Sequence, residues 1–331
     1  MHGEWLRYNQ LKSIVLILSL LFFGCLDSKK NIDKVQWSTI QTIELSKINS
    51  DIELEKPTID VGIYLPSNLD SSFNKVDLKM LIKGFKSAKR IYAPANVQLN
   101  LLWIKTGNIN KKFLSIQANE IPTIARTEYL NMYEHMKRHP AKLTEETSMA
   151  FQSIIEPSIN NHRTIYLIVL QDVFFPFLEV SEGRNWMIKT VRTGGLSFPT
   201  YSYVNSIPKE HRGAITITNL SRQDRLKRTI AHEIGHKAMN VSHEYYNMNP
   251  EHEIYAEGGL MIYGQGEEIP SGEKGRWHLE RLLLSPFIYK KNASGKKIWN
   301  PDYKEYGHYY DPIYGEFSIK FKGTSPIEEN W

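Results

Sequence analysis

One helix, expected to begin near Ser221 and to run past His236, constrains the fold of this chain most strongly. Ser221 and Asp224 have the spacing of a capping box at its start. Its apolar residues fall four apart and predict one buried stripe: Leu226, Ile230, Ile234 and Ala238. A short β-branched segment at residues 214–218 precedes the helix and indicates a strand. The helix is therefore expected to bury its apolar stripe within a mixed α/β arrangement.

The rest of the chain predicts a mixed α/β fold with a twisted mixed sheet. Strand patterns occupy residues 59–65, 97–104 and 164–173, and helical patterns occupy residues 76–92, 124–155 (broken near Pro140) and 274–284. After Asn240 the regular pattern thins out among glycines, which indicates a loop-rich C-terminal subdomain. We expect one domain over residues 58–331, divided near residue 241 into two subdomains.

The composition is that of an ordinary globular protein. Of 331 residues, 41% are hydrophobic and 23% are charged, which argues against a disordered or fibrous chain. The formal net charge of +5 is small for this length, and lysine and arginine form no long basic block. We therefore expect no nucleic-acid partner, and we expect a monomer.

The N-terminus has the pattern of a secretory signal. Arg7 and Lys12 precede an apolar run over residues 14–23, which is shorter than the about 20 residues that a membrane-spanning helix needs. The sequence Phe-Phe-Gly-Cys at residues 22–25 resembles the lipobox of bacterial lipoproteins. That resemblance implies a signal peptide over residues 1–24 and acylation of Cys25, the single cysteine of the chain.

Acylation of Cys25 would anchor the protein to a bacterial membrane, outside the cytoplasm, through its lipid. The polar residues that follow indicate a tether over residues 25–57. The alternative is a plain secretory signal with an incidental cysteine, in which case the protein is secreted or periplasmic.

Two histidines on the long helix suit a zinc site. His232 and His236 lie four residues apart, so their rings project from one face of the helix on successive turns. Neutral imidazoles at this separation can hold a zinc ion. Glu233 is placed to hydrogen-bond a water on the metal, whose pKa zinc lowers to about 7, and to act as its general base. The pattern predicts hydrolysis with one catalytic Zn²⁺ and proton transfer by Glu233 to the leaving amine.

A third ligand is required, and His243 is the candidate. With it, the pattern resembles the signature of the metzincin clan of zinc peptidases, HExxHxxGxxH followed by a methionine turn. In that signature a glycine ends the helix and turns the third histidine back to the metal. Here the glycine is missing and His243 stands one residue late. We expect Asn240 to replace the glycine, because asparagine tolerates the left-handed conformation and the spacing to His243 is then kept.

The segment Gly-Gly-Leu-Met-Ile-Tyr-Gly at residues 258–264 resembles the methionine turn. The resemblance implies that Met261 lies beneath the zinc ligands as an apolar floor. It also implies that Tyr263 binds zinc in the resting enzyme or donates a hydrogen bond to the oxyanion. The alternative for Met261 is an ordinary core methionine.

The metzincin resemblance covers roughly residues 214–264. It implies an α+β zincin-like fold and a zinc metalloendopeptidase that hydrolyses peptide or protein substrates. It also implies that residues 214–218 form the edge strand of the sheet, to which an extended substrate would add.

Two alternatives remain open. In gluzincins a glutamate completes the zinc site, and Glu253 or Glu257 could do so in place of His243. The protein could also be a non-catalytic surface lipoprotein. Structural zinc sites usually have four protein ligands and often use cysteine, whereas three histidines beside a glutamate favour an open, catalytic site.

Overall fold

The structure, a computed structural model, describes residues 32–70, 76–121, 142–158, 161–181, 185–199, 203, 207–218, 223–241, 243, 259–262, 266–269, 276–300, 306–311 and 315–320. The chain divides into two units, Met1–Asp33 and Lys34–Trp331, and the described helices and strands lie in the second. The expected signal peptide and Cys25 lie outside the described residues. Among the described residues, no helix is long and apolar enough to span a bilayer.

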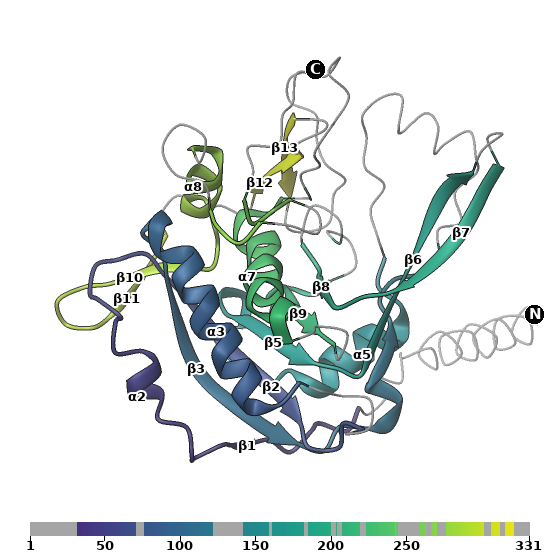
Figure 1. Ribbon diagram of the computed structural model, residues 1–331, viewed down its shortest axis with the longest axis horizontal. Coiled ribbons are helices and arrows are strands. Elements are labelled where there is room, and N and C mark those ends of the chain that lie inside the picture. Colours follow the sequence, from purple (N-terminus) through teal and green to yellow (C-terminus); the bar gives the residue numbers. More distant parts are fainter. Residues whose placement is uncertain are drawn as a thin grey trace, which may run out of the picture. The chain divides into compact units, whose positions relative to one another are not determined.

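The main sheet is mixed and twisted, and it comprises eight strands among the described residues (Figure 1). Its parallel centre has the order β3-β2-β5-β9. Antiparallel strands flank it: β1 pairs with β3, β8 with β9, and β10 with both β2 and β11. The bounds are β1 Ser38–Thr39, β2 Thr58–Pro66, β3 Gln98–Gly107, β5 Ile165–Val169, β8 Gly195–Ser197, β9 Ala214–Ile217, β10 Ile288–Lys291 and β11 Lys297–Trp299.

The described residues also form two smaller sheets. The first joins β4 in parallel to β6, which forms an antiparallel hairpin with β7. The second is an antiparallel pair of β12 and β13. Their bounds are β4 Ser115–Gln117, β6 Asp172–Ser181, β7 Asn185–Arg192, β12 Tyr306–Asp311 and β13 Gly315–Lys320. The C-terminal part, expected to be loop-rich, therefore contains strands β10 to β13.

The described α-helices include the long helix expected from the sequence. Their bounds are α2 Leu45–Ile48, α3 Leu78–Tyr92, α5 Glu145–Ile154, α7 Gln223–Met239 and α8 Arg276–Leu283. Helix α3 begins two residues later than its apolar pattern predicts, because the Asp77 side chain caps it and accepts a hydrogen bond from the Met80 N–H at 2.7 Å.

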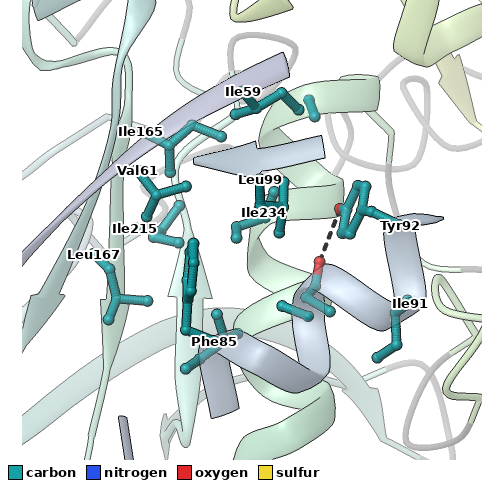
Figure 2. Packing of buried hydrophobic residues seen from close by; sticks show 14 of the residues in the cluster. Ile59, Val61, Phe85, Ile91, Tyr92, Leu99, Ile165, Leu167, Ile215 and Ile234 are labelled. Carbon is teal, nitrogen blue, oxygen red and sulfur yellow. Dashed lines mark hydrogen bonds between the residues drawn. The ribbon is translucent and has the colours of Figure 1, made fainter. Parts of the chain in front are cut away.

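The central strands bury both of their faces, because successive side chains point to opposite sides of a strand. One face packs against α3 and α7 through Ile59, Val61, Ile63, Ile165, Leu167, Val169, Ile215 and Ile217. The opposite face, with Tyr64, Tyr166, Ile168 and Ala214, packs against α5. Figure 2 shows the first of these two cores, where strand residues pack toward those of the two helices. The predicted stripe of α7 is confirmed, because all four of its residues belong to this core.

Helices α3 and α7 lie side by side over the main sheet (Figure 1). The Tyr92 hydroxyl at the end of α3 donates a hydrogen bond to the Ala231 carbonyl of α7 at 3.0 Å (Figure 2). This bond holds α7 just before His232. The helix that carries the two histidines is thus fixed by the core on one side and by α3 on another.

The segment at residues 164–173, which the sequence predicts as one strand, forms two. Strand β5 ends at Val169 and β6 begins at Asp172. Between them, the Leu170 N–H donates to the Ile217 carbonyl at 2.9 Å, while the Gln171 N–H donates to the Leu114 carbonyl at 2.8 Å. The chain therefore leaves the main sheet and enters the smaller one, although its apolar pattern continues.

The expectation that residues 214–218 form the edge of the sheet is wrong. Strand β9 is internal, with β5 parallel on one side and β8 antiparallel on the other. Among the described strands, β8 is the one that ends the sheet on this side. The expected tether also contains structure, because β1 pairs with β3 and Ile48 of α2 is buried.

Candidate metal centre

Helix α7 places His232, Glu233 and His236 at its C-terminal end, and all three side chains are buried. The helix ends at Met239, and Asn240 follows with a φ of 52°. This left-handed conformation confirms the role predicted for Asn240, since asparagine adopts it at less cost than most residues. The turn brings His243 back toward the two helical histidines.

The three histidines meet through their Nε2 atoms. The separations are 3.1 Å between His232 and His236, 3.2 Å between His236 and His243, and 3.0 Å between His243 and His232. Nitrogen ligands lie about 2.0–2.1 Å from zinc, so two of them in a tetrahedral site stand about 3.3 Å apart. The observed triangle fits that arrangement, and the three histidines could hold a metal ion.

The Nδ1 atoms of the two helical histidines fix which nitrogen carries the proton. His232 Nδ1 lies 2.6 Å from the Leu260 carbonyl, and His236 Nδ1 lies 2.7 Å from the Val241 carbonyl. A carbonyl only accepts hydrogen bonds, so each Nδ1 is the donor and each neutral ring presents its Nε2 lone pair. Burial lowers the pKa of His232 well below its ordinary value, which favours the neutral ring.

Lone pairs that converge in this way repel each other unless a cation lies between them. The two Nε2 atoms of α7 are within hydrogen-bond distance, yet neither carries a proton to donate to the other. A hydrogen bond between these two rings therefore does not explain their approach, and together with His243 they form a group that could hold a metal ion.

Glu233, which follows His232 in the sequence, faces strand β8. Burial raises the pKa of its carboxyl to about 8, and this effect exceeds the opposing influence of Arg228 and of a hydrogen bond from the Ser197 backbone. Gly195 of β8 permits the approach, because a β-carbon there would lie 2.8 Å from Glu233 Oε1 and 2.7 Å from Thr229 Cγ2. A carboxyl with a pKa near neutrality can both accept and release a proton.

The segment Gly259–Ile262 forms a turn beneath the helix. The Ile262 N–H donates to the Gly259 carbonyl at 3.2 Å, and Met261 is fully buried. A β-carbon on Gly235 would lie 2.6 Å from Met261 Sδ, so the methionine packs directly against Gly235, between the two histidines of α7 in the sequence. This contact places Met261 against the part of α7 that carries the histidines, while its predicted place beneath the zinc ligands as an apolar floor stays a prediction.

Several residues singled out in the sequence lie outside the described residues. These are Tyr263, the alternative ligands Glu253 and Glu257, and Cys25. Other parts of the site were not predicted from the sequence: Gly195, Ser197, Arg228 and the carbonyls of Val241 and Leu260. The adjacent glycines at residues 194 and 195 were the available signal for β8, whereas main-chain acceptors leave no signal in side-chain identities.

The left-handed conformation of Asn240 leads to a paired prediction. Asn240→Gly is expected to keep the melting temperature and zinc affinity of the wild type, because glycine adopts this conformation freely. Asn240→Val is expected to lower the melting temperature of the metal-free protein by about 2–8 °C, since left-handed backbone costs an ordinary residue about 1–2 kcal/mol. Thermal unfolding of both variants is the measurement. Equal losses in the two would show that backbone conformation is not the reason for Asn240.

The contact between Gly195 and Glu233 leads to a second prediction. Gly195→Ala is expected to leave zinc binding intact and to lower kcat/KM about 10- to 100-fold, because the added methyl group displaces the carboxylate. Zinc content and cleavage of labelled casein are measured on the same samples. Gly295→Ala is the control: its φ of 77° strains the new residue and lowers stability, but the open space around it means that the added methyl group displaces no side chain. Full activity of Gly195→Ala would contradict a role for the close approach of β8.

Comparisons with known proteins do not place the chain in a family: no protein-family model matches it, and no curated protein matches it. What can be said of the site comes from its own residues. Three histidines, two of them oriented by main-chain carbonyls, form a group that could hold a metal ion beside a buried carboxyl.

Proposed function

We propose that the protein is a zinc-dependent metalloendopeptidase of a zincin-like, metzincin-related kind. The observation that carries the proposal is the convergence of three Nε2 atoms within 3.0–3.2 Å of one another, with the buried Glu233 next to His232 in the sequence. His232, His236 and His243 would hold the metal. Three protein ligands leave a fourth position for water or substrate, which is the arrangement of catalytic rather than structural zinc.

Glu233 is proposed as the general base. A bound zinc ion supplies a Lewis acid that polarises the substrate carbonyl and makes a water acidic. The Glu233 carboxylate takes a proton from the attacking water and passes it to the nitrogen of the leaving amine. Its burial suits a group that carries a proton between two steps.

The edge of the sheet supports a peptide substrate. Strand β8 reaches the site through Gly195 and Ser197, and β9 occupies one of its sides. An extended peptide could pair with the other side, which would bring a backbone carbonyl toward Glu233. The substrate strand is thus proposed to add to β8, and not to residues 214–218 as the sequence suggested.

The location of the enzyme is proposed from the sequence. The N-terminal pattern favours export and acylation of Cys25, which would anchor the catalytic domain to a bacterial membrane on a non-cytoplasmic face. Export without acylation would release it as a secreted or periplasmic protein. We propose a monomer whose partners are the membrane and a peptide or protein substrate, and no nucleic acid.

The test is metal analysis of the purified protein together with a cleavage assay. We expect about one zinc ion per chain, loss of casein cleavage after treatment with a chelator, and recovery on adding zinc back. Failure of the protein to retain or take up zinc would overturn the metal site. Zinc binding without cleavage of casein or of a random peptide pool would favour the non-catalytic lipoprotein.

A further inference from the structure

Arg228 lies on α7 one turn before His232, and its guanidinium reaches across to the segment that contains Met261. Arg228 Nε donates to the Gly266 carbonyl at 2.6 Å, and Nη2 donates to the Leu260 carbonyl at 3.1 Å. Nη2 also donates to the Ile262 carbonyl. One side chain thus attaches three main-chain positions of the turn to the helix.

The carbonyl of Leu260 connects Arg228 to the metal site. The same oxygen accepts from His232 Nδ1 at 2.6 Å, and Arg228 Nη2 lies 3.2 Å from that Nδ1. Because Nδ1 carries its proton toward Leu260, the guanidinium is not a donor to the ring. Arginine and histidine instead share one acceptor, so the position of that carbonyl decides how the imidazole is turned.

The turn has bonds of its own that fold it locally. The Leu260 N–H donates to the Glu268 carbonyl at 2.5 Å, and the Ile262 N–H donates to the Gly259 carbonyl at 3.2 Å. Gly266 has a φ of 86°, and a β-carbon there would lie 1.8 Å from the Gly259 carbonyl oxygen. These contacts shape the segment, whereas the bonds from Arg228, together with the packing of Met261 on Gly235, hold it against α7.

We propose that Arg228 is a positioning residue for the metal centre: it holds the Leu260 carbonyl at the place where that carbonyl orients His232 for the metal. The inference rests on the proposed zinc site and adds a residue to it. Partners that orient a metal-binding histidine typically contribute about 10- to 100-fold to metal affinity. Lysine would not replace arginine fully, because an ammonium lacks the planar fork that serves several carbonyls at once.

The experiment measures zinc affinity of the full chain by competition with a chromophoric chelator. Arg228→Gln is expected to bind zinc about 10- to 100-fold more weakly than the wild type, and Arg228→Lys to lie between them. The absorption bands of the Co²⁺-substituted protein should change in shape in Arg228→Gln, because the ring of His232 is no longer held in one orientation.

Arg163→Gln is the matched control. Arg163 also donates to a main-chain carbonyl, that of Pro286, at 2.8 Å, and it stacks over Trp299. Its loss is expected to lower the melting temperature while leaving zinc affinity and the Co²⁺ spectrum unchanged. A general loss of stability is thereby separated from a loss of ligand orientation.

A decrease in zinc affinity of less than about three-fold in Arg228→Gln would overturn the inference. If that variant does not fold, Arg228→Lys decides by the same threshold. A wild type that binds no zinc would instead overturn the metal site itself, and this inference with it.

Discussion

Glu233→Gln is expected to retain zinc and to lose about 10²- to 10⁴-fold in kcat/KM for peptide hydrolysis, the usual contribution of a general base. Glutamine has nearly the same shape as glutamate, so the contacts with Gly195 and Ser197 persist while the group that accepts the proton is removed. Cleavage of labelled casein and zinc content, measured on the same preparation, provide the test.

Glu210→Gln is the control for this prediction. Glu210 is an exposed glutamate in the short 3-10 helix Lys209–His211 and does not belong to the histidine group. Its substitution should leave cleavage unchanged. A Glu233→Gln protein that is fully loaded with zinc and cleaves as fast as the wild type would rule out the proposed proton transfer.

His243→Ala is expected to weaken zinc binding by more than about 100-fold and to abolish cleavage. The variant keeps two of three ligands, and loss of a direct ligand should exceed the about 10- to 100-fold cost of losing an orienting partner. In the wild type, the Nε2 of His243 lies 3.0 Å from the Nε2 of His232 and 3.2 Å from the Nε2 of His236. Each of these two histidines already presents its own Nε2 to the proposed metal, so neither can replace His243. Competition with a chelator measures the affinity.

His162→Ala serves as the control, because His162 is half-buried and does not belong to the triangle. The gluzincin alternative makes the opposite prediction from ours. Zinc retained by His243→Ala but lost on replacing Glu257 or Glu253 with alanine would assign the third ligand to a glutamate.

The site on α7 could be predicted because its determinants are local. The four-residue spacing of His232 and His236, the apolar stripe and the turn at Asn240 are all encoded within about five turns of chain. The left-handed conformation of Asn240 could be predicted because Asn240 stands as far before His243 as the glycine of the signature stands before its third histidine, and because asparagine tolerates left-handed backbone better than most residues. The histidine triangle is therefore the part where sequence and structure agree most closely.

The surroundings of the site could not be predicted, because they depend on long-range pairing. Strand β8 has three residues, too few for an alternating pattern, and it meets Glu233 from a distant part of the sequence. In the sequence, nothing distinguishes Arg228 from an ordinary charged residue on a helix. Its partners are main-chain carbonyls of a turn more than thirty residues away, which no local pattern indicates. The division between β5 and β6 could not be predicted either, because both strands are rich in apolar residues and the break between them depends on which strands they pair with.

The acceptors that orient His232 and His236 are main-chain oxygens, those of Leu260 and Val241. A scan of single substitutions would therefore pass over both positions, because another apolar side chain leaves the oxygen where it is. Insertion or deletion of one residue between Met239 and His243, or within Gly259–Ile262, would instead move an oxygen away from its ring. The centre should tolerate drift in residue identity at these positions and very little change in loop length.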